Sequence, residues 1–202
     1  MRLKRFVKHF ARVSAASLFG AVLLAAEPAR AQTDPPRFEV GAQLSTVDMR
    51  ESVREKPLGI GGRFSYNLNE YAAVEAELNY FSTPEANLDR TQGLFGLKAG
   101  RRFGGDSPKV GVFVKARPGF VRFHGLREPG VSINGTTKPA LDLGGVLELY
   151  PSKRTVFRID AGDTIIFYGG ETVRRFSLPG APQERLGTGH GLQVAVGFGF
   201  RF

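Results

Sequence analysis

The residues of this sequence best suited to chemistry are charged side chains that recur at alternate positions of apolar segments. Five are basic and five are acidic: Arg63, Lys98, Lys115, Arg117 and Arg158, with Glu75, Glu77, Asp142, Glu148 and Asp160. Glu75 and Glu77 suggest paired carboxylates for acid–base catalysis, but residues two apart on an extended segment point to the same side. Buried ions are costly unless they are paired, so the equal numbers of the two signs predict an internal ion-pair network. We expect Arg63 or Lys115 to neutralise the two glutamates.

Two histidines beyond the first 31 residues, His124 and His190, are the other candidates for chemistry. Ser132 and Asp163 can lie within reach of them, but no spacing groups these four residues into a nucleophile, a base and an orienting acid. The chain contains no cysteine, which excludes metal–thiolate and cysteine-nucleophile chemistry. We therefore predict no catalytic residue, no metal site and no cofactor, and we do not expect an enzyme.

The first 31 residues have the three parts of a secretory signal peptide: a basic start, the apolar run 13–26, and the small-residue site Ala29-Arg30-Ala31. The run is too short for a spanning helix, which needs roughly 20 residues. We predict cleavage after Ala31, which leaves one domain at 32–202. Cleavage removes six basic residues and one acidic residue, so the formal charge falls from +9 to +4. The remaining charges are scattered and mixed in sign, which argues against a nucleic-acid partner.

Beyond residue 36, apolar and polar residues alternate through eight segments, which predicts strands with one apolar face. The segments are 37–47, 58–68, 71–81, 91–101, 110–123, 140–150, 155–168 and 189–202. Their connections alternate between short ones at 69–70, 102–109 and 151–154 and long ones at 48–57, 82–90, 124–139 and 169–188. This pattern predicts an all-β fold, an eight-stranded antiparallel up-and-down transmembrane β-barrel with short periplasmic turns, four outer loops and both ends in the periplasm.

Alternation alone does not say which face is outside, because a soluble calyx around a ligand also alternates. Here the glycines and the charges share one face, and an eight-stranded interior is narrow and filled by side chains. We therefore predict a filled, charged lumen and an apolar exterior that contacts lipid.

Asp163 is the exception on the apolar face. We expect either that Gly162 forms a bulge that turns Asp163 away, or that Asp163 lies at the outer rim. Aromatic residues near the segment ends predict interfacial girdles, with Tyr71, Phe103, Tyr150, Phe157 and Phe200 on the periplasmic side and Tyr80, Phe120 and Phe167 on the outer side.

The last segment ends in LQVAVGFGFRF at 192–202. With the signal sequence and the eight alternating segments, it resembles the small outer-membrane β-barrels related to the OmpA transmembrane domain, over essentially all of 37–202. In that family an aromatic terminal residue, preceded by apolar residues at alternate positions, is the signal read by the barrel-assembly machinery. The positions that match here are Val194, Val196, Phe198, Phe200 and Phe202. The sequence has no peptidoglycan-binding domain after the last strand, so we carry over no cell-wall anchoring.

The resemblance implies a place in the cell outer membrane, with its lipid and the assembly machinery as partners. We expect a structural or surface-interaction role, in which 124–139 and 169–188 are the main contact surfaces; the sequence does not identify the extracellular partner. A narrow porin-like channel is the second hypothesis, because the lumen charges can line a water path. An enzyme that modifies lipid A, using a rim histidine, is the third, and the soluble calyx is the fourth.

Overall fold

The computed structural model describes residues 36–49, 57–82, 89–104, 109–125, 127–128, 131–132, 135–170, 172–174, 183–185 and 187–202. The predicted signal peptide lies outside these residues. Within the described ranges, we find no helix with the length and apolar character needed to cross a membrane.

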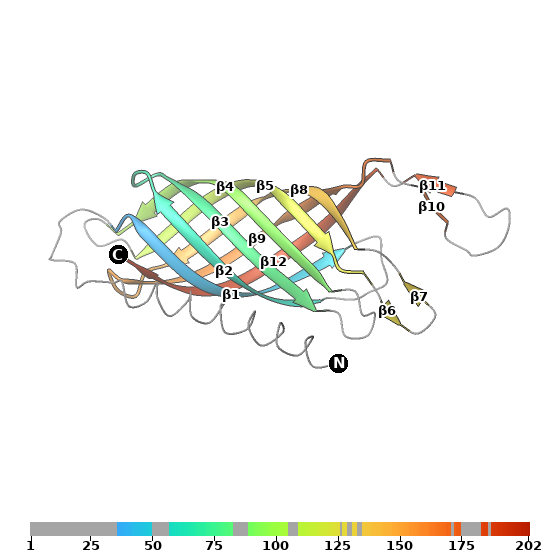
Figure 1. The fold of residues 1–202 in the computed structure, drawn as a ribbon. Coiled ribbons are helices and arrows are strands. Elements are labelled where there is room, and N and C mark those ends of the chain that lie inside the picture. The colour runs from blue at the N-terminus through green and yellow to red at the C-terminus, as the bar shows by residue number, and fades with distance from the viewer. Residues whose placement is uncertain are drawn as a thin grey trace, which may run out of the picture. The chain divides into compact units, whose positions relative to one another are not determined.

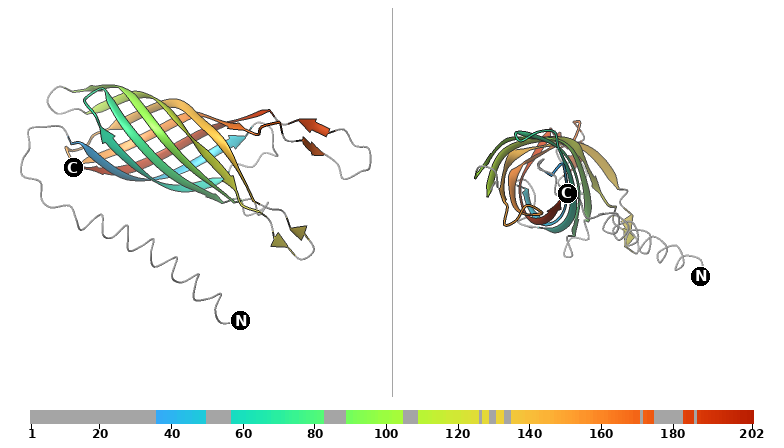
Figure 2. Two further views of the ribbon diagram at one scale, coloured as in Figure 1. Left: turned by 45° about the horizontal axis from the view of Figure 1, so that its top comes forward. Right: turned by 90° about the vertical axis from the view of Figure 1, so that its left-hand side faces the viewer.

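Eight long strands close into one barrel (Figure 1). They are β1 (Phe38–Met49), β2 (Leu58–Asn67), β3 (Ala72–Ser82), β4 (Arg90–Phe103), β5 (Val110–Phe123), β8 (Thr136–Leu149), β9 (Thr155–Phe167) and β12 (Thr188–Arg201). Each long strand pairs antiparallel with the next, and β12 pairs with β1 to close the ring. Figure 2 shows the closed ring in the view along the barrel. The predicted eight-stranded up-and-down barrel is confirmed.

Four short strands lie within two of the long connections. β6 (Arg127–Glu128) pairs with β7 (Val131–Ser132), and β10 (Thr172–Arg174) pairs with β11 (Gln183–Arg185). We predicted loops there, because pairs this short give no apolar alternation to detect. β8 also begins at Thr136, earlier than predicted, because its ladder with β5 continues to the pair Thr136 and Phe123.

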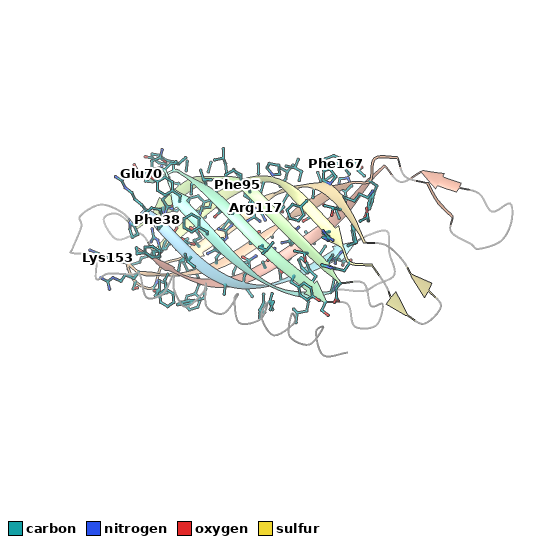
Figure 3. The ribbon with its side chains drawn as sticks, in the orientation of Figure 1. Phe38, Glu70, Phe95, Arg117, Lys153 and Phe167 are labelled. Atoms are coloured by element: carbon teal, nitrogen blue, oxygen red, sulfur yellow. The ribbon has the colours of Figure 1, made fainter. Side chains whose placement is uncertain are left out.

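The connections divide between the two ends of the barrel. The β2–β3, β4–β5 and β8–β9 turns lie at one end, which we call the turn end, and the other four connections lie at the opposite end, the loop end. Glu70 and Lys153 mark the turn end in Figure 3, and Phe167 marks the loop end. The tightest turn is stabilised by Asn69, whose Oδ1 accepts hydrogen bonds from the backbone amides of Tyr71 and Ala72, both at 2.8 Å.

The apolar face points outward and the charged face points inward. Val114 is 68% exposed and Leu143 is 40% exposed, whereas Arg158 is 2% and Glu148 0% exposed. This arrangement confirms the predicted orientation of the two faces and is the reverse of a soluble calyx. Small residues let the interior close: a Cβ at lumen-facing Gly61 would lie 1.9 Å from Asn79 Oδ1.

Of the two expectations for Asp163, a bulge at Gly162 or a place at the outer rim, the bulge is wrong. β9 keeps an unbroken register with both β8 and β12 on either side of this glycine. Gly162 faces inward, and a Cβ there would lie 2.6 Å from the Leu143 carbonyl oxygen, so the glycine allows close approach of two strands. Asp163 therefore remains on the outward face, where it contacts His190.

Tyr150 does not belong to the girdle in which we placed it. Its side chain is buried, because it continues the inward alternation of Asp142 and Glu148 on β8. The other predicted girdle residues point outward and are exposed: Tyr71, Phe103, Phe157 and Phe200 towards the turn end, and Tyr80, Phe120 and Phe167 towards the loop end.

Candidate functional site: the filled lumen

Arg158 on β9 is the centre of the ion pairs inside the barrel. Its guanidinium donates to both carboxylate oxygens of Glu75 on β3, with Nη2 2.9 Å from Oε2, and Nη2 also lies 2.8 Å from Asp160 Oδ2. Glu148 Oε1 is 3.4 Å from Arg158 Nη1 and is also bound by Lys98. The contact with Glu75 crosses the lumen between β9 and β3, which are not neighbours in the sheet, whereas Glu148 lies on the adjacent β8 and Asp160 on β9 itself.

Arg117 and Lys115 on β5 extend this cluster towards the loop end. Arg117 donates to Glu77 at 2.6 Å and to Asp142 Oδ2 at 2.6 and 2.9 Å. Lys115 lies 2.7 Å from Asp142 Oδ2 and also binds Asp160. We call the nine residues joined in this way the ionic network: Lys98, Lys115, Arg117, Arg158, Glu75, Glu77, Asp142, Glu148 and Asp160. All nine side chains are buried, and Arg117 is labelled in Figure 3.

The tenth predicted residue, Arg63, has a different partner. Its Nη2 donates to Glu39 Oε1 at 2.6 Å across the β1–β2 pair. Our expectation that Arg63 or Lys115 would neutralise Glu75 and Glu77 is therefore wrong: the cations that contact them are Arg158, Lys98 and Arg117. Glu39 is a lumen residue that the predicted network did not include. It occupies an inward position of the β1 alternation, and this pattern could have identified it.

Tyr150 and Arg102 extend the contacts to the turn end. The Tyr150 hydroxyl donates to Glu148 Oε2 and accepts from Arg102 Nε at 3.0 Å. The Glu148 carboxylate accepts this hydrogen bond, so the Tyr150 hydroxyl is the donor. The Arg201 guanidinium stacks over the same ring, 4.4 Å from its centre.

A layer of uncharged polar side chains covers the ionic network on its other side. Gln43 donates to Asn79 at 2.9 Å, Asn79 donates to Gln92 at 3.0 Å, and Gln92 donates to Gln193 at 3.0 Å. Asn79 also donates to Glu77 at 2.6 Å, which joins this amide layer to the ionic network. This layer was not predicted, because only the charged residues of the inward face were assigned to a network.

Apolar side chains close the lumen beyond the amide layer. This apolar collar consists of Val47, Phe81, Val121, Ala140 and Ile166, all buried and all near the loop-end termini of their strands. Gly59 makes room for the Phe81 ring, since a Cβ there would lie 2.5 Å from it. A cavity of about 10 Å³, at the lower limit for one water molecule, remains beside the collar, and Arg90, Gln92 and Thr164 also line it. The collar was not predicted, because its apolar residues lie on the face that is otherwise polar.

The two histidines lie outside the lumen. His190 Nδ1 is 2.6 Å from Asp163 Oδ2 on the outward face, and His124 Nε2 is 2.9 Å from Thr91 Oγ1 at the loop end. The structure thus brings together Asp163 and His190, while the Ser132 side chain lies outside the described residues. Within the described part of the chain, no three His, Cys, Asp or Glu side chains gather into a metal-binding group.

The proposed assembly residues occupy alternate outward positions of β12. Val194, Val196, Phe198 and Phe200 point away from the lumen, and the final residue, Phe202, is also exposed. The Phe198 ring packs on Phe157 of β9 with ring centres 5.1 Å apart, and on Phe200 at 4.9 Å. The terminal strand therefore carries an unbroken apolar stripe on its outer face.

A closed barrel with an apolar exterior, a filled polar interior and short turns at one end defines a transmembrane β-barrel. The family model of the outer membrane protein beta-barrel domain matches residues 16–202, and the chain belongs to this family. The protein is therefore an outer-membrane β-barrel.

Solved structures agree with this fold. The N-terminal barrel domain of Pseudomonas aeruginosa OprF is 13% identical with a TM-score of 0.51, over 81% of this chain and 97% of that chain. Neisserial surface protein A is 15% identical with a TM-score of 0.54, over 82% of this chain and 97% of that chain. A comparison with curated protein sequences finds no significant match.

Proposed function

We propose that this protein is a closed outer-membrane barrel that does not conduct ions and that presents its four outer connections as an interaction surface. The observation that carries the proposal is the filled lumen. The ionic network, the amide layer and the apolar collar follow one another along the barrel, and the cavity between the collar and Gln92 has a volume of about 10 Å³. A conducting path needs continuous water, and side chains that fill the lumen leave no room for it.

The arrangement of the connections supports an interaction role. The four long connections share one end of the barrel. In outer-membrane barrels the end with the long connections faces outward from the cell, and binding residues are concentrated on such loops over a rigid scaffold in many folds. Two of them contain their own antiparallel pairs, β6–β7 and β10–β11. Paired backbone of this kind gives a loop a defined surface at a lower entropic cost of binding.

Two features of the chain ends complete the proposal. Residues 1–31 act as a signal peptide cleaved after Ala31, so that the mature barrel domain is 32–202; the mass of the protein purified from outer membranes tests this. The stripe from Val194 to Phe202 acts as the signal for the barrel-assembly machinery, as the family resemblance implies. Its exposure on β12 supports this role, because the machinery can reach these side chains before the barrel meets lipid.

Conductance in planar bilayers tests the closed state. We expect no steady openings from the wild-type barrel, and none from Phe81→Ala, because the amide layer and the ionic network still fill the lumen below the collar. Steady wild-type openings whose ion selectivity changes in Glu77→Gln would contradict the proposal and favour the narrow channel.

A barrel without enzymatic activity should leave lipid A unchanged. We expect the same lipid A in cells that produce the protein and in cells that lack it.

A further inference from the structure

Asp163 and His190 form a polar pair on the apolar outer wall of the barrel. Asp163 Oδ2 lies 2.6 Å from His190 Nδ1, and the two side chains are 43% and 51% exposed. Their cross-strand neighbours are apolar: Asp163 pairs with Leu143 on β8 and Leu192 on β12, and His190 pairs with Ile165. Polar groups that face hydrocarbon cost free energy, so a polar contact from outside the barrel would stabilise this pair.

The pair lies inside the apolar band of the barrel. Asp163 is eight residues after the first residue of β9, Thr155, and four before the last, Phe167. With a rise of about 3.3 Å per residue and a tilt of about 45°, β9 covers about 28 Å of depth, and Asp163 lies roughly 9 Å from its loop end. The apolar band of such barrels is about 25 Å tall, and Ile165 and Phe167 continue the outward apolar face beyond Asp163. At this depth the acyl chains offer the pair no hydrogen bonds.

The pair keeps one donor and one acceptor to spare. A net charge is costly in hydrocarbon, which favours the two forms of the pair whose net charge is zero. In one, a protonated His190 donates from Nδ1 to an ionised Asp163; in the other, a protonated Asp163 donates from Oδ2 to Nδ1 of a neutral ring. Both forms leave His190 Nε2–H as a donor and Asp163 Oδ1 as an acceptor. Neither of these atoms has a hydrogen-bond partner among the described residues.

The outer wall is low directly beside the pair. Gly145 on β8 pairs with Ala161 on β9, two positions before Asp163, and both small residues are exposed. A Cβ at inward-facing Gly162 would lie 2.6 Å from a backbone oxygen, so the barrel itself requires that glycine. A Cβ at Gly145 would meet only the Phe113 carbonyl oxygen, 3.7 Å away, so strand packing does not require glycine there. Small residues on a membrane-facing surface let another protein approach closely.

We propose that this face of β8, β9 and β12 joins two copies of the chain, with Asp163 Oδ1 accepting a hydrogen bond from Nε2 of the partner subunit's His190. Copies of an outer-membrane barrel share one orientation, so a two-fold axis between them runs along the membrane normal and brings together residues of the same depth. Asp163 and His190 lie side by side, close to one depth. The two pairs therefore complement each other by symmetry, and the interface contains two such hydrogen bonds.

Disulfide cross-linking in isolated outer membranes tests the interface, because the chain has no cysteine of its own. We expect Ala161→Cys, beside the proposed axis, to give a covalent dimer on oxidation with copper phenanthroline. The matched control is Ala76→Cys, which faces outward on β3, on the opposite side of the ring from β9, and should remain monomeric.

Energy transfer between copies labelled at Lys153→Cys, diluted with increasing lipid in phosphatidylcholine vesicles, gives the dissociation constant of the dimer. We expect His190→Phe, which removes both hydrogen bonds between the copies, to raise this constant roughly 5- to 100-fold. Gly145→Leu should also raise it, because the leucine fills the low part of the wall. The controls are His124→Phe and Gly62→Leu, which change an outward histidine on β5 and an outward glycine on β2 and should leave the constant unchanged. Heat-modifiable migration confirms that each variant is folded.

Three results would overturn the inference. No more cross-linked dimer from Ala161→Cys than from Ala76→Cys would show that β9 does not lie at an interface between copies. A dissociation constant unchanged in both His190→Phe and Gly145→Leu would show that neither the polar pair nor the low wall contacts a second copy. Cross-linking of Ala161→Cys to a protein of another mass, without a dimer, would assign this face to a different partner.

Discussion

Replacing Arg158 by methionine removes the central cation of the ionic network while keeping most of its apolar volume. Arg158 contacts Glu75, Asp160 and Glu148, and its own side chain is almost completely buried. Removing one partner of a buried pair costs about 3–5 kcal/mol. Each of the three acids keeps a second cation, with Lys98 near Glu75 and Glu148 and Lys115 near Asp160. We therefore expect the free energy of unfolding to fall by about 3 kcal/mol, the lower end of that range.

Urea unfolding of the barrel in phospholipid vesicles measures this loss. The chain has no tryptophan, so far-UV circular dichroism and gel migration before boiling report the folded fraction. Adding Glu75→Gln to Arg158→Met should recover part of the loss, because it removes the excess negative charge. The control is Lys153→Met in an exposed turn, where we expect a change below about 0.5 kcal/mol. A loss for Arg158→Met as small as the loss for Lys153→Met would refute the reasoning.

Three further predictions concern the ends of the barrel. Deleting Phe202 should lower the yield of folded barrel in cells, measured by heat-modifiable migration, far more than it alters the behaviour of the outer connections. A normal yield of folded barrel would rule out a role of Phe202 in assembly. Tyr150→Phe removes the hydrogen bond to Glu148 and should destabilise the barrel by about 1–3 kcal/mol in urea unfolding, whereas an unchanged midpoint would show that Glu148 is satisfied without it. Because the chain has no cysteine, single cysteines give a clean test of topology: Gly187→Cys should react with an impermeant thiol reagent on intact cells, and Lys153→Cys should react only after the outer membrane is opened. The reverse pattern of labelling would show that the barrel has the opposite orientation in the membrane.

The strand order and the orientation of the faces were predictable because period two is a local property. Each segment from 37 to 202 carries its own alternation, and the short and long connections then allow one simple topology. The choice of ion-pair partner is different, because it depends on strand tilt and on which side chains meet across the lumen. Arg158 meets Glu75, 83 positions away, and this contact exists only once the ring has closed.

The missed features have a common physical origin. Membrane barrels need a polar lumen only where charges or water must be accommodated, and the loop end can be closed by apolar side chains such as Phe81 and Ile166. A rule that assigns polar residues to the inside therefore fails at that end. Tyr150 was misassigned for a related reason: aromatic type suggested a girdle, although the alternation of β8 placed it beside Glu148 in the lumen.

The measurement that tests the central claim most directly is the environment of a single tryptophan at position 114. Val114 points outward from β5, and Lys115, next to it, points into the ionic network. In vesicles of phospholipid with brominated acyl chains, Val114→Trp should emit at short wavelength and be strongly quenched, whereas Lys153→Trp in the turn should not. Long-wavelength emission from Val114→Trp without quenching by the brominated chains would contradict an apolar exterior around an ionic lumen.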